Sequence, residues 1–395
     1  MHDKEHVVFN TAFIKVIDKV YSKENLTAYV EQMHLNNLFP SFKEEITNGK
    51  ISFKVENTLF YKNGSGVFSK FIQFIYQRVY KDGFFFIRLF RKIDPKEDVL
   101  FITHMHPITF FFFKLIKIFF PKIKVLIVLH GDADSVLTRN KHNLPVSFWG
   151  IIYMLGFKIK QANCYYILLS KLGLKLLSEK KILLKKEMLD IPHPYFYTNR
   201  TPASIDLKQK INIGYIGSLT NRKNGQLFID IANKIKQSSA AEHYIFSQIG
   251  SIDQNFLLLL NENIKVVKKE NGYIDRNLFQ IKIAEIDYAI FLFPNDEFRI
   301  RVSGAFYDAV EFCKPLIVLK SDYFDSIFEE AGNIGYVCNS TSNIVDLLQY
   351  LIEYPAIRKE QYMQQCENLS KYRDKLSISN VKRRLIGELE AKNLL

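Results

Sequence analysis

Three features that define large protein classes are missing from this sequence: a long apolar run, a paired-cysteine motif and a glycine fingerprint for dinucleotides. The longest uncharged runs, with histidine counted as neutral, are Val99 to Phe113 and His142 to Phe157. Both contain proline and are shorter than the ~20 residues that a membrane-spanning helix needs. The first residues, MHDKEHVVFN, contain acids and no basic-then-apolar order, so we expect no signal peptide and a cytoplasmic location.

The cysteines are scattered and form no C-x-x-C pair, which fits structural thiols in a reducing compartment. They are Cys164, Cys313, Cys338 and Cys366. Neither G-x-G-x-x-G nor a P-loop sequence occurs, which argues against a nicotinamide-dependent oxidoreductase.

The net charge of +13 belongs entirely to the first half of the chain. Residues 1–200 hold 30 lysines and arginines against 17 acidic residues, whereas residues 201–395 hold 24 of each. A basic half can face nucleic acid, an anionic membrane surface or an acidic substrate. The sequence contains no nucleic-acid-binding motif, so we expect no nucleic acid partner.

The same half sets aromatic residues among cations, in residues 82–93 and in PITFFFFKLIKIFFPKIK (107–124). One interpretation is an amphipathic surface helix that inserts phenylalanine among lipid headgroups, at the inner face of a membrane. The other is a core helix whose lysines reach out to solvent. The charge asymmetry favours contact with an anionic membrane surface.

Short, nearly continuous apolar runs alternate with helical segments, as in parallel α/β sheets. We predict strands at residues 98–103, 124–130, 164–170, 210–217, 242–250, 263–269, 287–294, 315–321 and 334–339, and a further strand in HVVFN (6–10). The length of 395 residues suits two domains.

We therefore predict two Rossmann-like domains, at residues 1–195 and 210–372. The polar, proline-containing segment 196–209 is the predicted linker between them. The C-terminal helix, 373–395, can cross back to the first domain.

The stretch GYIGSLTNRKNG (214–225) joins a predicted strand to a predicted helix. Glycines at such a joint let backbone N–H groups approach an anion, and the helix N-terminus adds partial positive charge. Arg222 and Lys223 lie in the loop, where they can pair with a phosphate near Gly217 and Ser218. A glycine loop with solvated surface cations is the alternative.

A second stretch, FLFPNDEFRIRVSGAFYDAVEFCKP (291–315), repeats this arrangement. Ser303 is a predicted N-cap, and Gly304 leaves room for a ligand at the first helical turn. Arg299 and Arg301 flank that N-terminus, and Asp308 follows one turn later. Two helix N-termini, each with a pair of cations, suit a diphosphate, and Asp308 can accept hydrogen bonds from a ribose diol.

These stretches resemble the GT-B glycosyltransferases of family 4, which use nucleotide-sugar donors. Family members open their second domain with G-x-I-G-x-L and a basic K-N-G loop, to which GYIGSLTNRKNG is similar. DAVEFCKP (308–315) matches the end of an acidic-x7-Glu element, with Asp308 in place of the second glutamate and Ile300 in place of the first. Arg299 to Ala309 also resembles a basic-x-x-S-G-x-x-x-D-A version, and the resemblance extends to VLHG (128–131) and IPHPYF (191–196).

The resemblance implies a cleft between two domains, with the nucleotide-sugar donor on the second domain and the acceptor on the basic first one. His130 would lie near the donor sugar, with Arg222 and Lys223 on the diphosphate. It also implies transfer with retention of configuration, with no metal and no other cofactor. The basic, phenylalanine-rich domain favours a lipid-linked saccharide acceptor in surface polysaccharide synthesis.

Other interpretations of the same residues stay open. His130 can be a helix-capping or loop histidine. The pair His104 and His106 has H-x-H spacing but no evident third metal ligand. Asp132 and Asp134 form the D-x-D motif that holds a metal in another glycosyltransferase fold. Because Ile300 replaces an acid, the chain can also be a degenerate GT-B protein that binds a nucleotide-sugar, or a membrane, and acts as a partner subunit.

Overall fold

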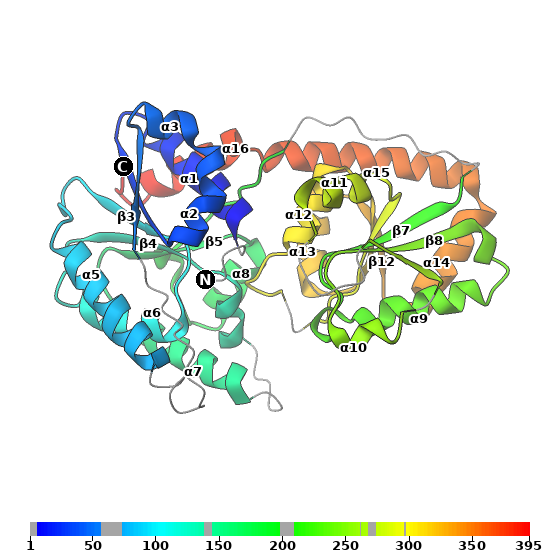
Figure 1. Cartoon of the computed structure of the whole chain (residues 1–395), viewed down its shortest axis with the longest axis horizontal. Coiled ribbons are helices and arrows are strands. Elements are labelled where there is room, and N and C mark those ends of the chain that lie inside the picture. The colour runs from blue at the N-terminus through cyan, green and yellow to red at the C-terminus, as the bar shows by residue number, and fades with distance from the viewer. Residues whose placement is uncertain are drawn as a thin grey trace. The chain divides into compact units, whose positions relative to one another are not determined.

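The computed structural model describes residues 6–56, 73–137, 144–197, 209–260, 262–267, 274–295 and 298–395 (Figure 1). The chain divides into two compact units. Unit 1 comprises Met1–Phe196, Arg299–Val302 and Leu376–Leu395, and unit 2 comprises Tyr197–Phe298 and Ser303–Lys375. Most of the predicted linker falls in residues 198–208, outside the described residues.

Unit 1 is built on a parallel four-stranded sheet of order β3-β4-β5-β6, beside a parallel pair of strands, β1 and β2. The strands are β1 (Leu26–Val30), β2 (Ile51–Val55), β3 (Val99–Ile102), β4 (Lys124–Val128), β5 (Cys164–Leu168) and β6 (Met188–Asp190). The helices are α1 (Val7–Val20), α2 (Gln32–Leu38), α3 (Lys43–Thr47), α5 (Asp82–Phe90), α6 (Pro107–Lys117), α7 (Leu144–Lys158), α8 (Lys171–Glu179) and α16 (Ile378–Glu390). Short helical turns are η1 (Phe39–Ser41), η2 (Tyr76–Lys81, a π-helix), η3 (Gly131–Val136) and η4 (Lys185–Glu187).

Apolar cores cover both faces of this sheet, which explains why its strands read as continuous apolar runs. In Figure 1, α5, α6 and α7 lie on one face of the sheet and α1 and α16 on the other. Phe86, Phe110, Phe113 and Phe157 fill the first core. The second core joins α1 and α16 to the alternate side chains of β4, β5 and β6.

Two predictions about unit 1 are wrong. The segment HVVFN opens α1 instead of forming a strand, because Phe9, Phe13, Val16 and Ile17 recur at helical spacing and bury one stripe against the sheet.

The lysines of α6, which the core-helix interpretation sends out to solvent, are buried instead. Lys114 is 2% exposed and Lys117 is 0% exposed. The ammonium of Lys117 donates to three backbone carbonyls, those of Phe120, Pro121 and Ala162. That of Lys114 donates to the hydroxyl of Tyr166 at 3.1 Å.

Unit 2 contains a parallel six-stranded sheet of order β12-β11-β10-β7-β8-β9. Its strands are β7 (Ile211–Ile216), β8 (Tyr244–Ile249), β9 (Ile264–Val266), β10 (Tyr288–Phe291), β11 (Leu316–Leu319) and β12 (Gly335–Cys338). Its helices are α9 (Gly225–Lys236), α10 (Gln254–Leu257), α11 (Arg276–Ala284), α12 (Gly304–Glu311), α13 (Asp322–Ala331), α14 (Thr341–Glu353) and α15 (Pro355–Lys375), with short turns at η5 (Asn221–Lys223) and η6 (Ala241–His243).

Strand β7 lies at the centre of this sheet, between β8 and β10. Because all strands are parallel, the turns after β7 and β10 leave the sheet at the same edge. Alternate residues of β7 face α9 and α14, whose apolar stripes complete the core on that side. Apart from HVVFN, the predicted strands of both units are confirmed, with shorter ends. No helix among the described residues is long and apolar enough to cross a membrane.

Candidate functional site

The turn after β7 is shaped by two glycines from neighbouring strands. Gly217 has φ +99°, a conformation that strongly favours glycine, and its N–H donates to the carbonyl of Ile249 at 2.7 Å. Gly250 follows β8, and a Cβ there would lie 2.0 Å from the oxygen of Gly217. The backbones of the two turns therefore approach each other more closely than side chains would allow.

Buried polar groups hold this turn in place. Gln248, fully buried at the end of β8, donates to the carbonyls of Gly217 at 3.0 Å and Ser251 at 3.1 Å. The hydroxyl of Ser251 bonds that of Ser218 at 2.7 Å. By contrast, Gly214 lies within β7, where its missing side chain makes room for Ile286. Of the two glycines in the predicted loop, only Gly217 shapes the turn.

Lys223 brings positive charge onto the β7 turn. A Cβ on Gly217 would lie 3.2 Å from the Nζ atom of Lys223 and 3.4 Å from the Cβ of Ala305, in the first turn of α12. The loop backbone is fixed independently of the lysine side chain, because the hydroxyl of Tyr215 donates to the carbonyl of Lys223 and Asn224 donates to that of Leu292. The predicted turns thus lie side by side in unit 2. Arg222 is exposed in the same loop.

The N-terminus of α12 is capped as predicted. The hydroxyl of Ser303 accepts a hydrogen bond from the N–H of Phe306, and the N–H of Ser303 donates to the hydroxyl of Tyr323. A Cβ added at Gly304 would meet no atom within 4 Å. The first turn of α12 is therefore open at Gly304.

Asp308, one turn further along α12, is paired with a cation that sequence reasoning missed. The Nη2 atom of Arg276, the first residue of α11, lies 2.7 Å from the Oδ1 atom of Asp308. Asp308 is buried and Arg276 is partly exposed. Any ribose hydroxyl at Asp308 would share its carboxylate with this guanidinium.

The remaining predicted residues belong to unit 1. His130 follows β4 and is covered by α1, whose Phe9 ring meets its imidazole edge-on at 4.5 Å, while the ring of His6 lies 4.7 Å away. Its Nε2 atom is buried with no hydrogen-bond partner among the described residues. Burial, together with His6, His104 and His193 nearby, lowers the pKa of His130 well below 6.5, so the imidazole is neutral at neutral pH.

Arg299 and Arg301 lie in the short segment Arg299–Val302 of unit 1. The guanidinium of Arg301 donates to the carbonyl of Gly131 at 3.0 Å and lies 3.8 Å from the carboxylate of Asp134. Asp134 also accepts from the N–H groups of Ile300 and Arg301. In this structure Arg301 is thus engaged with the β4 turn.

Side chains of the H-x-H and D-x-D motifs of unit 1 make contacts within the fold. His106 caps α6 by accepting from the N–H of Ile108, whereas His104 faces His130, so the two histidines of H-x-H separate. Asp134 of the D-x-D motif receives backbone N–H groups, and the side chain of Asp132 lies outside what the structure describes. Among the described residues, no group of three or more histidine, cysteine or acidic side chains could hold a metal ion.

No family model matches the chain, and no curated protein sequence matches it. Solved structures do match. WaaG, a glycosyltransferase involved in lipopolysaccharide biosynthesis, is 10% identical with a TM-score of 0.60 over 95% of this chain and 94% of WaaG. A UDP-forming trehalose-phosphate synthase from Burkholderia vietnamiensis is 9% identical with a TM-score of 0.59, over 93% and 100%. The chain has the GT-B fold.

A TarM variant from S. aureus is similar over a smaller part of its length, at 14% identity and a TM-score of 0.54. The match covers 78% of this chain and 57% of TarM, so the chain spans little more than half of that relative. Identities this low establish the GT-B fold, and the fold by itself does not assign an activity.

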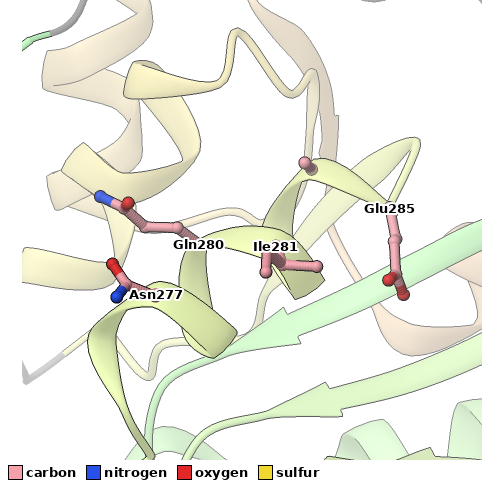
Figure 2. A pocket seen from close by; sticks show the side chains of 5 residues that line it. Asn277, Gln280, Ile281 and Glu285 are labelled. Carbon is pink, nitrogen blue, oxygen red and sulfur yellow. The ribbon is translucent and has the colours of Figure 1, made fainter.

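A pocket of about 440 Å³ lies on the surface of α11 (Figure 2). It is lined by Asn277, Gln280, Ile281, Ala284 and Glu285. Both carboxylate oxygens of Glu285 accept from Lys282 at 2.8 Å. The pocket contains none of the predicted site residues of this GT-B chain, and a single helix face offers no converging polar groups.

Proposed function

We propose that the chain is a glycosyltransferase that moves a sugar from a nucleotide-diphosphate sugar to a saccharide acceptor. One observation carries the proposal: the Lys223 ammonium lies over the Gly217 turn and beside the first turn of α12. In open α/β sheets, ligands bind at this carboxyl edge of the strands. The N-terminus of α12 and a cation beside the Gly217 turn suit a dianionic leaving group.

In the transfer, the bond from the anomeric carbon to the diphosphate oxygen breaks, and a bond to an acceptor hydroxyl oxygen forms. The hydroxyl proton leaves with the diphosphate. Negative charge therefore grows on the diphosphate in the transition state, and stabilising it is the main task of the protein. We assign this task to Lys223 and Arg222, with the N–H group of Gly304. That of Ser303, the other amide expected there, donates to Tyr323 in this structure.

Relatives of the same fold support a uridine donor. TarM was solved with UDP and α-GlcNAc-glycerol, and S. aureus MnaA, 13% identical with a TM-score of 0.50, was solved with UDP. For the acceptor we propose a lipid-linked saccharide of a surface polysaccharide, at the cytoplasmic face of a membrane. The role of WaaG in lipopolysaccharide biosynthesis and the net charge of +13 support it.

We further propose retention of configuration without a metal. Asp308 would contact the ribose beside Arg276. His130 would contact the donor sugar once the cover formed by His6 and Phe9 moves, and its neutral imidazole can accept or donate a hydrogen bond. Arg299 and Arg301 would meet the diphosphate only after Arg301 leaves the carbonyl of Gly131.

The test is turnover of UDP-sugars by the purified chain, with Lys223→Ala compared with Lys236→Ala. Lys236 is exposed in the last turn of α9, so its loss removes the same charge from the far end of the helix that follows the Lys223 turn. We expect Lys223→Ala to lower the release of UDP about 100-fold, as for the loss of a transition-state donor, and Lys236→Ala to leave it unchanged. Equal rates in the two folded variants would contradict the assignment. NMR identifies the anomer of the product and so distinguishes retention from inversion of configuration.

A catalytically degenerate partner subunit is the second candidate. Ile300, which stands where the family carries an acid, is 2% exposed and packs in the apolar core of unit 1. The side chain at this position is therefore apolar and turned into the core. This candidate predicts that the chain binds UDP or a UDP-sugar in calorimetry but neither hydrolyses nor transfers the sugar.

A further inference from the structure

The helices η2–α5, α6 and α7 of unit 1 present an apolar outer side, called here the aromatic face. Along the first helix, Tyr76, Tyr80 and Phe84 are exposed, and their rings stack in series at 5.1 and 6.5 Å. Phe119, just beyond α6, is 80% exposed, and Ile151 and Leu155 are exposed on α7. The three helices are packed neighbours in one layer, so these side chains belong to one side of unit 1 (Figure 1).

The middle helix of this layer is apolar on its outer side as well as its inner side. Phe110 and Phe113 are buried in the core, while Phe111, Phe112 and Leu115 are partly exposed on the outer side. Its lysines, Lys114 and Lys117, are buried and bind a tyrosine hydroxyl and backbone carbonyls. A surface helix normally places charges on its outer side. The apolar outer side of α6 indicates that it meets an apolar medium.

Charge on the helices of the aromatic face is predominantly positive. In residues 73–92, 107–122 and 148–160, the sole acidic residue is Asp82. Asp82 is buried and accepts from the hydroxyl of Thr109 at 2.7 Å. The exposed cations lie at the C-terminal ends of the three helices, and they are Arg88, Arg91, Lys92, Lys122, Lys158 and Lys160.

These cations gather along one border of the face. Each helix leads back to the start of the next parallel strand, so the three C-terminal ends meet at the amino edge of the sheet. Arg88 pairs with Glu56 and Lys160 with Glu187. The exposed Asp94, Glu97 and Asp98 follow α5 at the same border, where the cations outnumber the carboxylates. The aromatic face is thus an apolar surface with a border of net positive charge.

We propose that the aromatic face docks onto the surface of an anionic phospholipid membrane. Exposed aromatic rings enter the boundary between headgroups and acyl chains, and the cationic border binds the lipid phosphates. A second copy of this chain is a poorer occupant, because a two-fold contact would pair the face with itself and bring together two borders of net positive charge. This proposal concerns unit 1 and does not depend on the proposed transferase activity.

The single tryptophan of the chain is a built-in reporter of this docking. Trp149 lies on α7 beside the exposed Phe148, at a ring distance of 5.0 Å, and contacts Phe74 and His106 at the start of the neighbouring helices. Insertion of the face would move its indole toward the acyl chains, which shifts its emission to shorter wavelength and exposes it to quenchers attached to lipid tails.

The experiment is co-flotation of the full chain with vesicles of phosphatidylcholine alone or of phosphatidylcholine and phosphatidylglycerol in equal parts, with Trp149 fluorescence read in parallel. The test variant is Phe84→Ser/Phe119→Ser/Ile151→Ser. The matched control, Leu258→Ser/Ile281→Ser/Met363→Ser, removes three exposed apolar side chains from unit 2. A charge variant, Lys122→Glu/Lys158→Glu, alters the border alone. Circular dichroism verifies that each variant is folded.

We expect the wild type and the control to float with the anionic vesicles and to show the tryptophan shift. Partitioning of the test variant should fall at least ~10-fold, given the apolar area removed. Partitioning of the charge variant should fall at least ~25-fold, because each of the two cations lost near an anionic surface accounts for about a factor of five. The proposal is overturned if the wild type does not bind anionic vesicles, if the test variant and the control bind alike, or if the test variant instead dissolves a dimer of the wild type in sedimentation.

Discussion

Replacing Gly304 with alanine should strengthen the fold and weaken nucleotide binding at the same time. Gly304 is the first residue of α12, and a Cβ there would meet no protein atom within 4 Å. Alanine restricts the unfolded chain and favours the helix, so the free energy of unfolding should rise by about 0.5–1 kcal/mol. In a helix the Cβ points toward the N-terminus, where the diphosphate is proposed to lie.

The loss of affinity follows from the same methyl group. A phosphate displaced from the first-turn N–H groups forfeits a hydrogen bond to a charged group, worth about 1.5–3 kcal/mol. At about 1.4 kcal/mol for each factor of ten, the Kd for UDP should rise roughly 10- to 150-fold.

Urea unfolding and calorimetric titration with UDP measure the two effects. The control is Gly387→Ala in α16, where an added Cβ also meets nothing within 4 Å, so it should stabilise without changing the Kd. If Gly304→Ala binds UDP as tightly as Gly387→Ala does, the first turn of α12 does not approach the diphosphate and this reasoning is refuted.

Three further substitutions address the fold that supports the site. Gly250→Ala should lower the free energy of unfolding by at least about 2 kcal/mol in urea titrations, because its Cβ would lie 2.0 Å from the oxygen of Gly217; unchanged stability would contradict the close approach. Lys117→Met should destabilise by about 1–3 kcal/mol in the same titrations, since three carbonyls lose a charged donor, although those of Phe120 and Pro121 keep the N–H of Ile123 and the amide of Asn163; a stabilised variant would refute this. Burial raises the pKa of Asp134, so the folded chain binds the proton of this carboxyl more tightly than the unfolded chain does. The contribution of Asp134 to the free energy of unfolding therefore falls as the pH rises from about 4 through the folded pKa. Asp134→Asn should remove that fall from unfolding curves recorded over pH, and an unchanged slope would count against it.

The sequence predicts those parts of the structure that depend on residues close to one another in the chain. Continuous apolar runs identify strands such as β7 and β10, because burial on both faces demands them. Ser303 is recognisable as a cap because its hydroxyl replaces a missing backbone partner within three residues. Gly217 stands out at a strand-to-helix joint, where its positive φ is required.

The parts that escaped prediction depend on contacts between distant residues. Arg276 reaches Asp308 from 32 positions earlier in the chain, and no local signal marks the pair. Gln248 holds the Gly217 turn from a neighbouring strand. HVVFN is too short for periodicity to separate a strand from a helix, and α1 forms because the residues after it continue the helical stripe. Lys117 looks like a surface residue until its three carbonyl partners are known.

Binding of uridine, UMP and UDP to the wild-type chain, compared by calorimetry, decides whether the turns after β7 and β10 hold a diphosphate. If Lys223 and the first turn of α12 bind the phosphates, affinity should rise stepwise, with UDP at least about tenfold tighter than UMP, as one added charged hydrogen bond provides. High salt should diminish that step. Equal affinities for uridine and UDP, or no binding of any of the three, would contradict the proposed site.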